Sequence, residues 1–324
     1  PMALSDKVAT IFGGTGFIGR HIVRELAKNN ITVRVATRSP EKAYFLRPFG
    51  VVGQIVPEYC NINDDADLRR LIEGSDYVVN CIGILSEKGR ATFERMHQQL
   101  PERIAGMCAA QEIARFVHIS ALGADNNPSR YAQTKKAGED AILQHFPGAT
   151  ILRPSVVFGP GDGFFNMFAK MSCFLPALPL IGGGATRFQP VYVDDVADAA
   201  IAAITRADVG NDSPCGKVYE LGGPEIVNFR EVYELLFEHT GRKRWLIPLP
   251  FGVAKLQATL MGVLPNPPLT RDQVESLKSD NVVSGEALKL EDLGITPTAM
   301  RLVLPEYLRL YKPGGRFADV GRSE

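Results

Sequence analysis

The sequence predicts an α/β fold in which a doubly wound parallel sheet is joined to a smaller composite C-terminal region. Short apolar runs alternate with amphipathic stretches over residues 7–120. The runs are almost continuously apolar, as strands are when helices cover both faces of a sheet. The alternation fades in residues 160–190, which are rich in Gly, Pro and Phe. The sheet is therefore expected mainly from the first half of the chain.

The individual elements follow from the hydrophobic pattern in chain order. Strands are predicted at the apolar runs 7–12, 32–37, 53–57, 77–83, 115–120 and 149–154. Helices are predicted between and after them at 19–29, 41–46, 65–74, 92–111 and 130–146. A further helix, strand and helix are predicted at 193–205, 217–223 and 228–241, after which the chain is helical and broken by prolines.

The composition is that of a folded, soluble protein. The 324 residues are 45% hydrophobic and 22% charged, and 36 basic residues balance 36 acidic ones, so the chain as a whole has no electrostatic attraction to nucleic acid. Five scattered cysteines without a CxxC pair indicate reduced thiols. The sequence predicts no metal site, no signal or transit peptide and no membrane-spanning helix.

The segment KVATIFGGTGFIGRHIVREL has the order strand, glycine turn and helix. Gly13, Gly16 and Gly19 fit the spacing GxxGxxG, and Gly14, Gly16 and Gly19 fit GxGxxG. Either set permits a tight turn that brings main-chain N–H groups and a helix N-terminus to a pyrophosphate. Because the turn follows the first strand and opens a βαβ series, it predicts a nucleotide-binding, Rossmann-like domain. A purely structural turn is the alternative.

The end of the second predicted strand indicates which nucleotide binds. A strand that holds the ribose of NAD ends in Asp or Glu, but Arg38 and Ser39 stand at that place. A guanidinium can bind a 2′-phosphate in a bidentate manner, whereas a carboxylate would repel it. We predict NADPH as the cofactor, with NADP(H) preferred over NAD(H); an ordinary solvated Arg38 is the alternative.

These observations divide the chain into two regions. The predicted NADP(H)-binding Rossmann domain comprises residues 1–160, with strands also contributed by about 185–225. The predicted smaller C-terminal domain comprises residues 161–190 and 225–324, and includes a segment that faces a partner or the membrane.

Several motifs together resemble the extended and atypical short-chain dehydrogenases/reductases. They are the glycine loop, Asn80–Gly83, Ser120, the pair Tyr131 and Lys135, and the segment LRPSVVFGPGD. In that family a Ser, a Tyr and a Lys form the catalytic set. The Tyr transfers a proton, the Lys holds the nicotinamide ribose and lowers the pKa of the Tyr, and the Ser positions the substrate carbonyl. The resemblance makes Ser120, Tyr131 and Lys135 the matching positions.

The resemblance also implies which residues hold the cofactor. Asn61 and Ile62 resemble the adenine contact, although Asp is usual at the first place, and residues 153–159 resemble the segment that holds the carboxamide. The predicted cofactor-binding set is Gly13, Thr15, Gly16, Phe17, Ile18, Gly19, Arg38, Ser39, Asn61, Ile62, Cys81, Ile82, Gly83, Ser120, Tyr131, Lys135, Pro154 and Val157.

Four further segments are similar to the nucleotide-binding accessory subunits of respiratory complex I (NADH:ubiquinone oxidoreductase): SRYAQTKKAGE, FQPVYVDDVADA, PLPFGVAKL and LTRDQVESLKSDN. Those subunits are atypical short-chain dehydrogenases that hold NADPH without a known turnover. The resemblance implies a non-catalytic role in assembly or stability, with other complex I subunits as partners. It also implies a peripheral place on the cytoplasmic face of a bacterial inner membrane or the matrix face of the mitochondrial inner membrane.

Two other functions are alternatives from the same motifs. One is an active NADPH-dependent reductase or epimerase that acts on a hydrophobic or sugar-like substrate. The other is an NADP(H)-sensing regulatory protein.

The pair Tyr131 and Lys135 is therefore either an acid–base pair or a clamp for the ribose. Four positions apart on a helix, the two side chains share one face, and a neighbouring ammonium lowers the pKa of a phenol. Two departures from the family favour the clamp. Ser120 and Tyr131 are only eleven positions apart, and the active-site Asn of many family members has no clear match, although His97 lies nearby. Chance spacing of the pair is the remaining alternative.

Residues 244–269 combine several prolines with few charges. The predicted helix 251–262 is apolar nearly all round, with Lys255 as its charged residue, so it must be buried in the protein, in a partner or at a bilayer interface. The basic cluster 241–245 precedes it, as at a membrane edge. We expect contact with the membrane interface; an ordinary core is the alternative. The apolar stretch 164–184 is core, a substrate cover or a partner surface.

Three remaining features have ordinary structural explanations. Asp194 or Asp195 is predicted to be the N-cap of the helix that follows VYVDDV. His118, on the fifth predicted strand, is predicted to be packed rather than catalytic. The tail 311–324 is predicted to be poorly ordered or bound to a partner.

Overall fold

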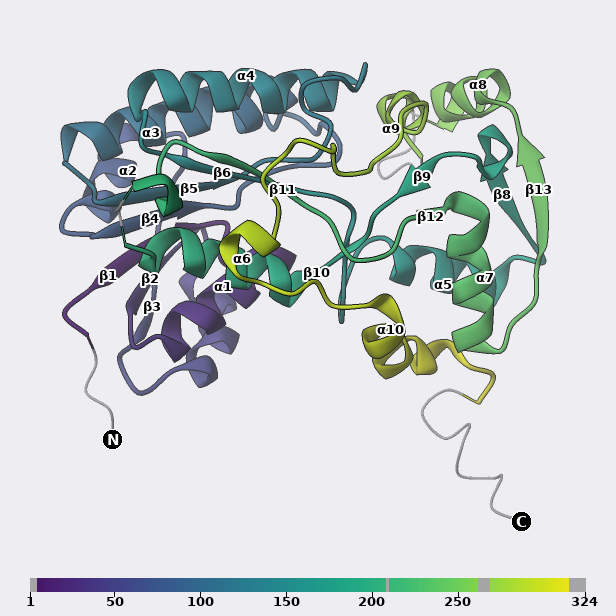
Figure 1. The fold of residues 1–324 in the computed structure, drawn as a ribbon, viewed down its shortest axis with the longest axis horizontal. Coiled ribbons are helices and arrows are strands. Elements are labelled where there is room, and N and C mark those ends of the chain that lie inside the picture. Colours follow the sequence, from purple (N-terminus) through teal and green to yellow (C-terminus); the bar gives the residue numbers. More distant parts are fainter. Residues whose placement is uncertain (1–4, 208–209, 262–268, 315–324) are drawn as a thin grey trace, which may run out of the picture.

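The computed structural model describes residues 5–207, 210–261 and 269–314. Within them, the main sheet has seven strands in the order β11-β6-β5-β4-β1-β2-β3, and all neighbouring pairs are parallel. The strands are β1 (Val8–Phe12), β2 (Thr32–Thr37), β3 (Ile55–Tyr59), β4 (Tyr77–Asn80), β5 (Arg115–Ile119), β6 (Thr150–Pro154) and β11 (Val218–Leu221). The chain winds outward on both sides of β1, which confirms the predicted doubly wound sheet (Figure 1).

Helices cover both faces of this sheet, and each face has its own apolar core. On one face lie α1 (Phe17–Lys28), α6 (Val193–Thr205) and η1 (Pro40–Phe49). On the other lie α2 (Asp65–Ile72), α3 (Leu100–Ala110) and α4 (Arg130–His145) (Figure 1). Burial on both sides explains why the strands are apolar without alternation.

Two predicted helices differ in detail from the structure. The helix predicted at 41–46 is the 3₁₀ helix η1, which contains Pro48. The long helix predicted at 92–111 begins as a π-helical turn, η2 (Glu94–Gln99), before α3. Pro101 has no N–H to donate to the carbonyl of His97 four residues earlier, so the regular α-helical bond is missing at this place. In addition, α4 packs so closely that a Cβ on Gly138 would overlap that same carbonyl oxygen.

The predicted N-cap of α6 is wrong. Its N-cap is Tyr192, which makes no side-chain cap bond. Asp194 instead accepts from Arg24 Nη2 at 2.6 Å and lies 2.6 Å from His21 Nδ1. Asp195 accepts from the backbone N–H of Thr298 at 2.7 Å. The two carboxylates therefore tie α6 to α1 and to the C-terminal segment rather than closing their own helix.

The smaller region packs around a separate apolar core. Its main elements are α5 (Phe165–Phe174), β8 (Ala177–Ile181), α7 (Phe229–Thr240), β13 (Trp245–Leu249), α8 (Phe251–Met261), α9 (Arg271–Ser276) and α10 (Met300–Leu308). Three two-stranded sheets complete it: β8 with β13, β7 (Val157–Phe158) with β10 (Val191–Tyr192), and β9 (Arg187–Phe188) with β12 (Val227–Asn228). It forms a second lobe beside the sheet domain (Figure 1).

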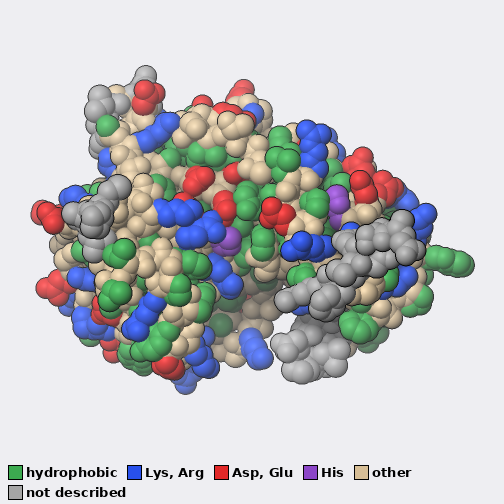
Figure 2. Space-filling view, turned by 90° about the horizontal axis from the view of Figure 1, so that it is seen from below, with side chains coloured by type: hydrophobic (Ala, Val, Ile, Leu, Met, Phe, Trp, Pro, Cys, Tyr) green, Lys and Arg blue, Asp and Glu red, His purple; other side chains and the backbone are tan. Residues whose placement is uncertain are grey.

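The distribution of charge on the surface agrees with the equal numbers of acidic and basic residues in the sequence. Figure 2 shows acidic and basic side chains interleaved over the underside of the molecule. None of the described helices combines the length and the apolar character that crossing a bilayer requires. Part of the apolar segment predicted at 244–269, residues 262–268, and part of the tail, residues 315–324, lie outside the described residues.

Candidate nucleotide site

The glycine loop between β1 and α1 has the geometry that a pyrophosphate requires. Gly13 has a φ of +79°, and a Cβ on it would lie 3.0 Å from the backbone of Cys81 and Ile82. A Cβ on Gly19 would overlap the Gly13 carbonyl oxygen, so only glycine fits there. The N-cap of α1 is Gly16, and the first turn contains no acidic residue, which leaves this helix N-terminus suited to an anion.

The other predicted residues of the loop frame the same turn. Phe17 packs edge-on against the His21 ring, with centroids 5.8 Å apart, and Ile18 packs against the core under α1. The carbonyl of Thr15 faces the Arg20 guanidinium, whose Nε donates to Gly16 O at 3.2 Å. These contacts fix the loop in its turn.

The ends of β2 and β3 lie side by side next to this loop. The N–H of Cys60 donates to Thr37 O at 2.8 Å, so the two strands end side by side. Arg38 and Asn61 are the next residues along the chain after Thr37 and Cys60. Arg38 is exposed, and Ser39 is the N-cap of η1, with its N–H bonded to Thr37 Oγ1. Asn61 uses its side-chain oxygen to accept from the Asn63 N–H at 3.1 Å, which shapes the turn.

A small cavity of about 60 Å³ lies against Ile62, the predicted adenine contact. It is lined by Ile62, Asn63, Arg95, Met96, Gln99, Leu100 and Arg103. Arg103 Nη1 donates to Ile62 O at 3.0 Å and so holds the turn in place. Arg95 and Arg103 are not among the predicted site residues, because their positions depend on how η2 and α3 pack over the end of β3.

Lys135 on α4 reaches the ends of β4 and β5. Its Nζ donates to Ile119 O at 3.2 Å, and a Cβ on Gly83 would lie only 3.1 Å from Nζ. The side chain is buried, and desolvation lowers the pKa of the ammonium to about 8, against a raising contribution from Glu139. Gly83 therefore leaves room for this ammonium at the end of β4, where the resemblance places the ribose.

Tyr131 does not have the ionisation that proton transfer favours. Its ring centroid is 6.0 Å from Lys135 Nζ, which points to the Ile119 carbonyl instead. Burial raises the pKa of Tyr131 to about 12. The structure therefore does not support the expectation that the lysine lowers the tyrosine pKa, because burial raises this pKa and the ammonium points elsewhere.

His97, singled out by its position in the sequence, packs under Tyr131. The two rings meet edge-on with centroids 5.1 Å apart. Its Nε2 accepts from the N–H of Ile84 at 3.0 Å, which requires the neutral ring with the proton on Nδ1, 3.2 Å from Thr134 Oγ1. Burial lowers the pKa of His97 to about 3, so the ring is neutral at physiological pH. His118 is fully buried beside Asn80, as predicted.

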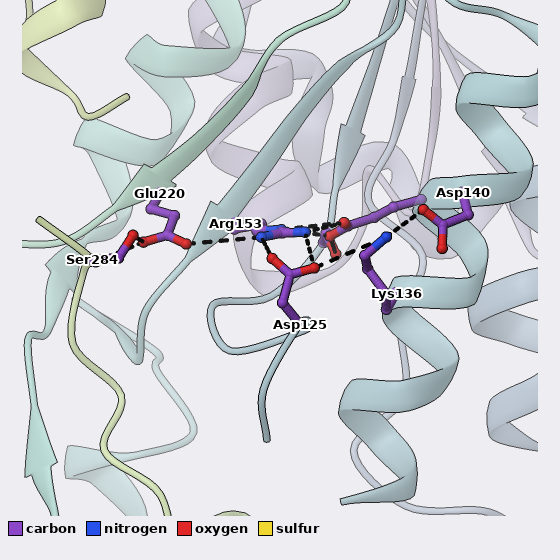
Figure 3. Close-up of polar contacts among 8 residues, drawn as sticks. Asp125, Lys136, Asp140, Arg153, Glu220 and Ser284 are labelled. Carbon is purple, nitrogen blue, oxygen red and sulfur yellow. Dashed lines mark hydrogen bonds and ion pairs between the residues drawn. The ribbon is translucent and has the colours of Figure 1, made fainter. Parts of the chain in front are cut away.

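Ser120 donates its hydroxyl to Glu139, a buried carboxylate one helical turn beyond Lys135. Glu139 in turn accepts from Arg153 Nε at 2.9 Å and from Nη2 at 2.5 Å. Figure 3 shows Asp125 lying between Arg153 and Lys136, with Glu220 and Ser284 on the other side of Arg153. The predicted serine is thus part of a charged network.

Sequence reasoning missed this network. The signal was a charged residue inside the apolar run ATILRP, since an arginine in a strand buried on both faces needs a carboxylate partner.

The predicted carboxamide segment is fixed from the C-terminal region. Asn281 Oδ1 accepts from Ser155 Oγ at 2.6 Å and from the N–H of Val156 at 3.0 Å. The Pro154 carbonyl accepts from the N–H of Leu122 at 2.9 Å, and Val157 pairs with Val191 between β7 and β10. The structure thus brings the glycine loop, the end of β4 and Lys135 together and places Pro154 and Val157 at the boundary with the smaller region.

Comparison with known proteins agrees with this geometry. The chain is 37% identical over 330 residues to the Arabidopsis thaliana protein named NADH dehydrogenase (ubiquinone) 1 alpha subcomplex subunit 9, mitochondrial; the match covers 97% of this chain and 80% of that protein. The Mus musculus protein of the same name is 33% identical over 314 residues, with 96% and 82% covered. The chain belongs to the family of these complex I subunits.

The subunit 9 family lies within a broader one. Residues 9–222 match the NAD dependent epimerase/dehydratase family. A solved structure of the Citrobacter sp. triphenylmethane reductase, complexed with NADP(H), superimposes with a TM-score of 0.72 at 19% identity and covers 94% of this chain and 99% of that one. That likeness shows the shared α/β fold, and the named relatives show the family.

Proposed function

We propose that this chain is an NADPH-binding accessory subunit of respiratory complex I that holds its nucleotide without turning it over. The observation that carries the proposal is the engagement of Ser120. A serine that positions a substrate carbonyl must donate its single hydroxyl proton to that oxygen. Ser120 already donates this proton to Glu139. The raised pKa of Tyr131 supports the same conclusion, because a general acid works best with a pKa near the operating pH.

The preference for NADPH rests on Arg38. The residue is exposed at the end of β2, next to the turn that follows β3. Among the described residues no carboxylate partner of Arg38 is observed, so its guanidinium is available to a 2′-phosphate. The bound nucleotide would stabilise the fold in proportion to the excess of its concentration over Kd.

The proposed place of the chain is the membrane side of complex I, at the matrix or cytoplasmic face. Its relatives are named as mitochondrial subunits of that enzyme. On α8, Val253, Leu256 and Leu260 are 51%, 61% and 68% exposed, and Trp245 on β13 is 82% exposed. Apolar side chains gathered on one helix suit the lipid–water interface. Arg242 and Arg244 donate to the carbonyls of Tyr311 and Ser172, so Lys243 is the exposed cation of the basic cluster.

The decisive experiment is a titration of the purified chain with NADPH and NADH. We expect tighter binding of NADPH, and we expect Arg38→Asp to weaken it by roughly 1.5–3 kcal/mol, the value of one charge-assisted contact. NADH binding should not weaken in this variant, because the new carboxylate can accept from the ribose 2′-hydroxyl. Lys42→Asp, nearby on η1, is the matched control for a change of surface charge. Equal affinities of the wild type for the two nucleotides would contradict the proposed preference.

The same preparation tests the absence of turnover. NADPH absorbance should persist in the presence of carbonyl substrates. Oxidation of NADPH that disappears in Tyr131→Phe would show that the chain is an active reductase instead.

A further inference from the structure

The first turn of α4, which carries Tyr131, is closed by a carboxylate from a distant part of the chain. Asp272 Oδ1 accepts from the N–H of Arg130 at 2.7 Å, and Oδ2 accepts from the N–H of Tyr131 at 3.0 Å. The next N–H, that of Ala132, bonds to the N-cap Ser129. Donors in the first turn lack partners within their own helix, and an anion there also interacts favourably with the helix dipole. Asp272 therefore fixes the turn on which Tyr131 stands.

The position of Asp272 is set by α9 rather than by α4. Thr270 and Gln273 form a capping box at the start of α9, and Val274 is fully buried. At the end of α9, the carbonyl of Ser276 accepts from Asn127 Nδ2 at 3.0 Å. Asn127 belongs to the short loop between Ser120 and Tyr131. The helix α9 thus holds both the loop and the helix that follows it.

The same helix is attached to α8. Lys255 Nζ on α8 lies 2.6 Å from Glu275 Oε1 on α9. Ala254 and Ala258 of α8 share the core of the smaller region with Val274. A continuous set of contacts therefore runs from the exposed apolar face of α8, through α9, to the helix that carries Tyr131 and Lys135.

We propose that Asp272 is a positioning residue of the nucleotide site and that α9 couples the nucleotide to the surface of α8. The inference rests on the proposed binding of NADPH by Tyr131 and Lys135. A nucleotide that orders the first turn of α4 must stabilise the bonds of that turn to Asp272, and hence α9. Because linkage is reciprocal, an α9 that is held in place must also favour the nucleotide.

The test combines a matched pair of variants with amide hydrogen exchange of the whole chain. Asp272→Asn keeps the shape of the side chain and removes its charge. Asp280→Asn is the control, because Asp280 lies in the same segment and also accepts a main-chain N–H, that of Arg187 at 2.8 Å. Within the described residues its hydrogen bonds and ion pair go to the main chain and guanidinium of Arg187 rather than to α4. Thermal stability and NADPH affinity are measured for both, and exchange in residues 271–276 is measured with and without NADPH.

We expect Asp272→Asn to weaken NADPH binding by about fivefold or more, the lower range of couplings between linked sites. Asp280→Asn should leave the affinity unchanged even if both variants lose similar stability. In the wild type, NADPH should slow exchange in α9, and this protection should be absent in Asp272→Asn. An α9 that NADPH does not protect in the wild type overturns the inference, and this measurement requires no variant.

An unchanged NADPH affinity in Asp272→Asn overturns the inference as well. Failure of the wild type to bind NADPH would instead overturn the proposed function. Titration of the wild type with NADPH therefore distinguishes a failure of the proposed function from a failure of this inference.

Discussion

Replacement of Arg153 by Met should strongly destabilise the sheet domain. The guanidinium lies between Glu139, Asp125 and Glu220, and its side chain is only 8% exposed. Methionine has a similar length and fills the same space, so the change removes the charge and the hydrogen bonds rather than the volume. The variant leaves three carboxylates near one another without the cation that neutralises them.

The size of the expected loss in unfolding free energy follows from how well water can reach each carboxylate. The Glu139 side chain is only 2% exposed, so water cannot replace Arg153 there. Glu220, at 14% exposure, keeps its bonds from the N–H and the hydroxyl of Ser284, and Asp125, at 50% exposure, is solvated. Breaking a buried ion pair by removing one partner costs about 3–5 kcal/mol. With m-values of about 3 kcal/mol/M for chains larger than the smallest domains, the urea midpoint should fall by roughly 1 M or more.

The assay is urea unfolding of the wild type, Arg153→Met and the surface control Lys136→Met. Lys136 pairs with Asp140 on the exposed side of α4, where both side chains are well solvated, so its loss should cost less than about 1 kcal/mol. The double variant Arg153→Met with Glu139→Met should recover part of the loss, because no buried charge remains in that pair. A midpoint for Arg153→Met equal to that of Lys136→Met would refute the reasoning.

Two further predictions concern pH and the apolar surface. Because burial lowers the pKa of Lys135 to about 8, NADPH binding should weaken between about pH 7 and 9 as the ammonium is lost, and calorimetry should show no such dependence in Lys135→Met. The unliganded chain should gain stability from about pH 8 toward 10.5, since the unfolded chain holds this proton more tightly. Placing Asp at Val253, Leu256 and Leu260 should release the chain from membranes in a flotation assay while NADPH binding survives, whereas Ala254→Asp on the buried face should unfold the smaller region.

The fold was predictable because the pattern of this sequence is strong and local. The apolar runs ATIF and RVAT, the glycine loop between them and the following amphipathic helix together specify the first βαβ unit. The fourth strand was predicted to run to Gly83, but in the structure it ends at Asn80. The side-chain oxygen of Asn80 accepts from the N–H of Ile82, and this bond turns the chain away from the sheet. Such an end is fixed by one side-chain contact, which no periodicity reveals.

Within the candidate site, the sequence predicted the glycine turn before α1, which the structure contains. The contacts of Ser120 and of the turn that carries Tyr131 come instead from segments far away in the sequence. Glu139 reaches Ser120 and Arg153 because α4 lies over the ends of β5 and β6, and Asp272 reaches α4 across 141 residues. These pairings depend on tertiary packing, so neither the charge pattern nor the spacing of Tyr131 and Lys135 contains them.

Lys135 gives a physical reason why such a site would retain its nucleotide as a structural component. A lysine ammonium has three N–H donors. Among the residues that the structure describes, the hydrogen-bond acceptor for them is the Ile119 carbonyl, and burial already disfavours the charge. Ribose hydroxyls bonded to Lys135 Nζ would supply the missing acceptors in a poorly solvated place, where each bond contributes more than it does in water. The same desolvation that raises the pKa of Tyr131 and makes it a poor proton donor would therefore strengthen the bonds of Lys135 to the proposed ligand.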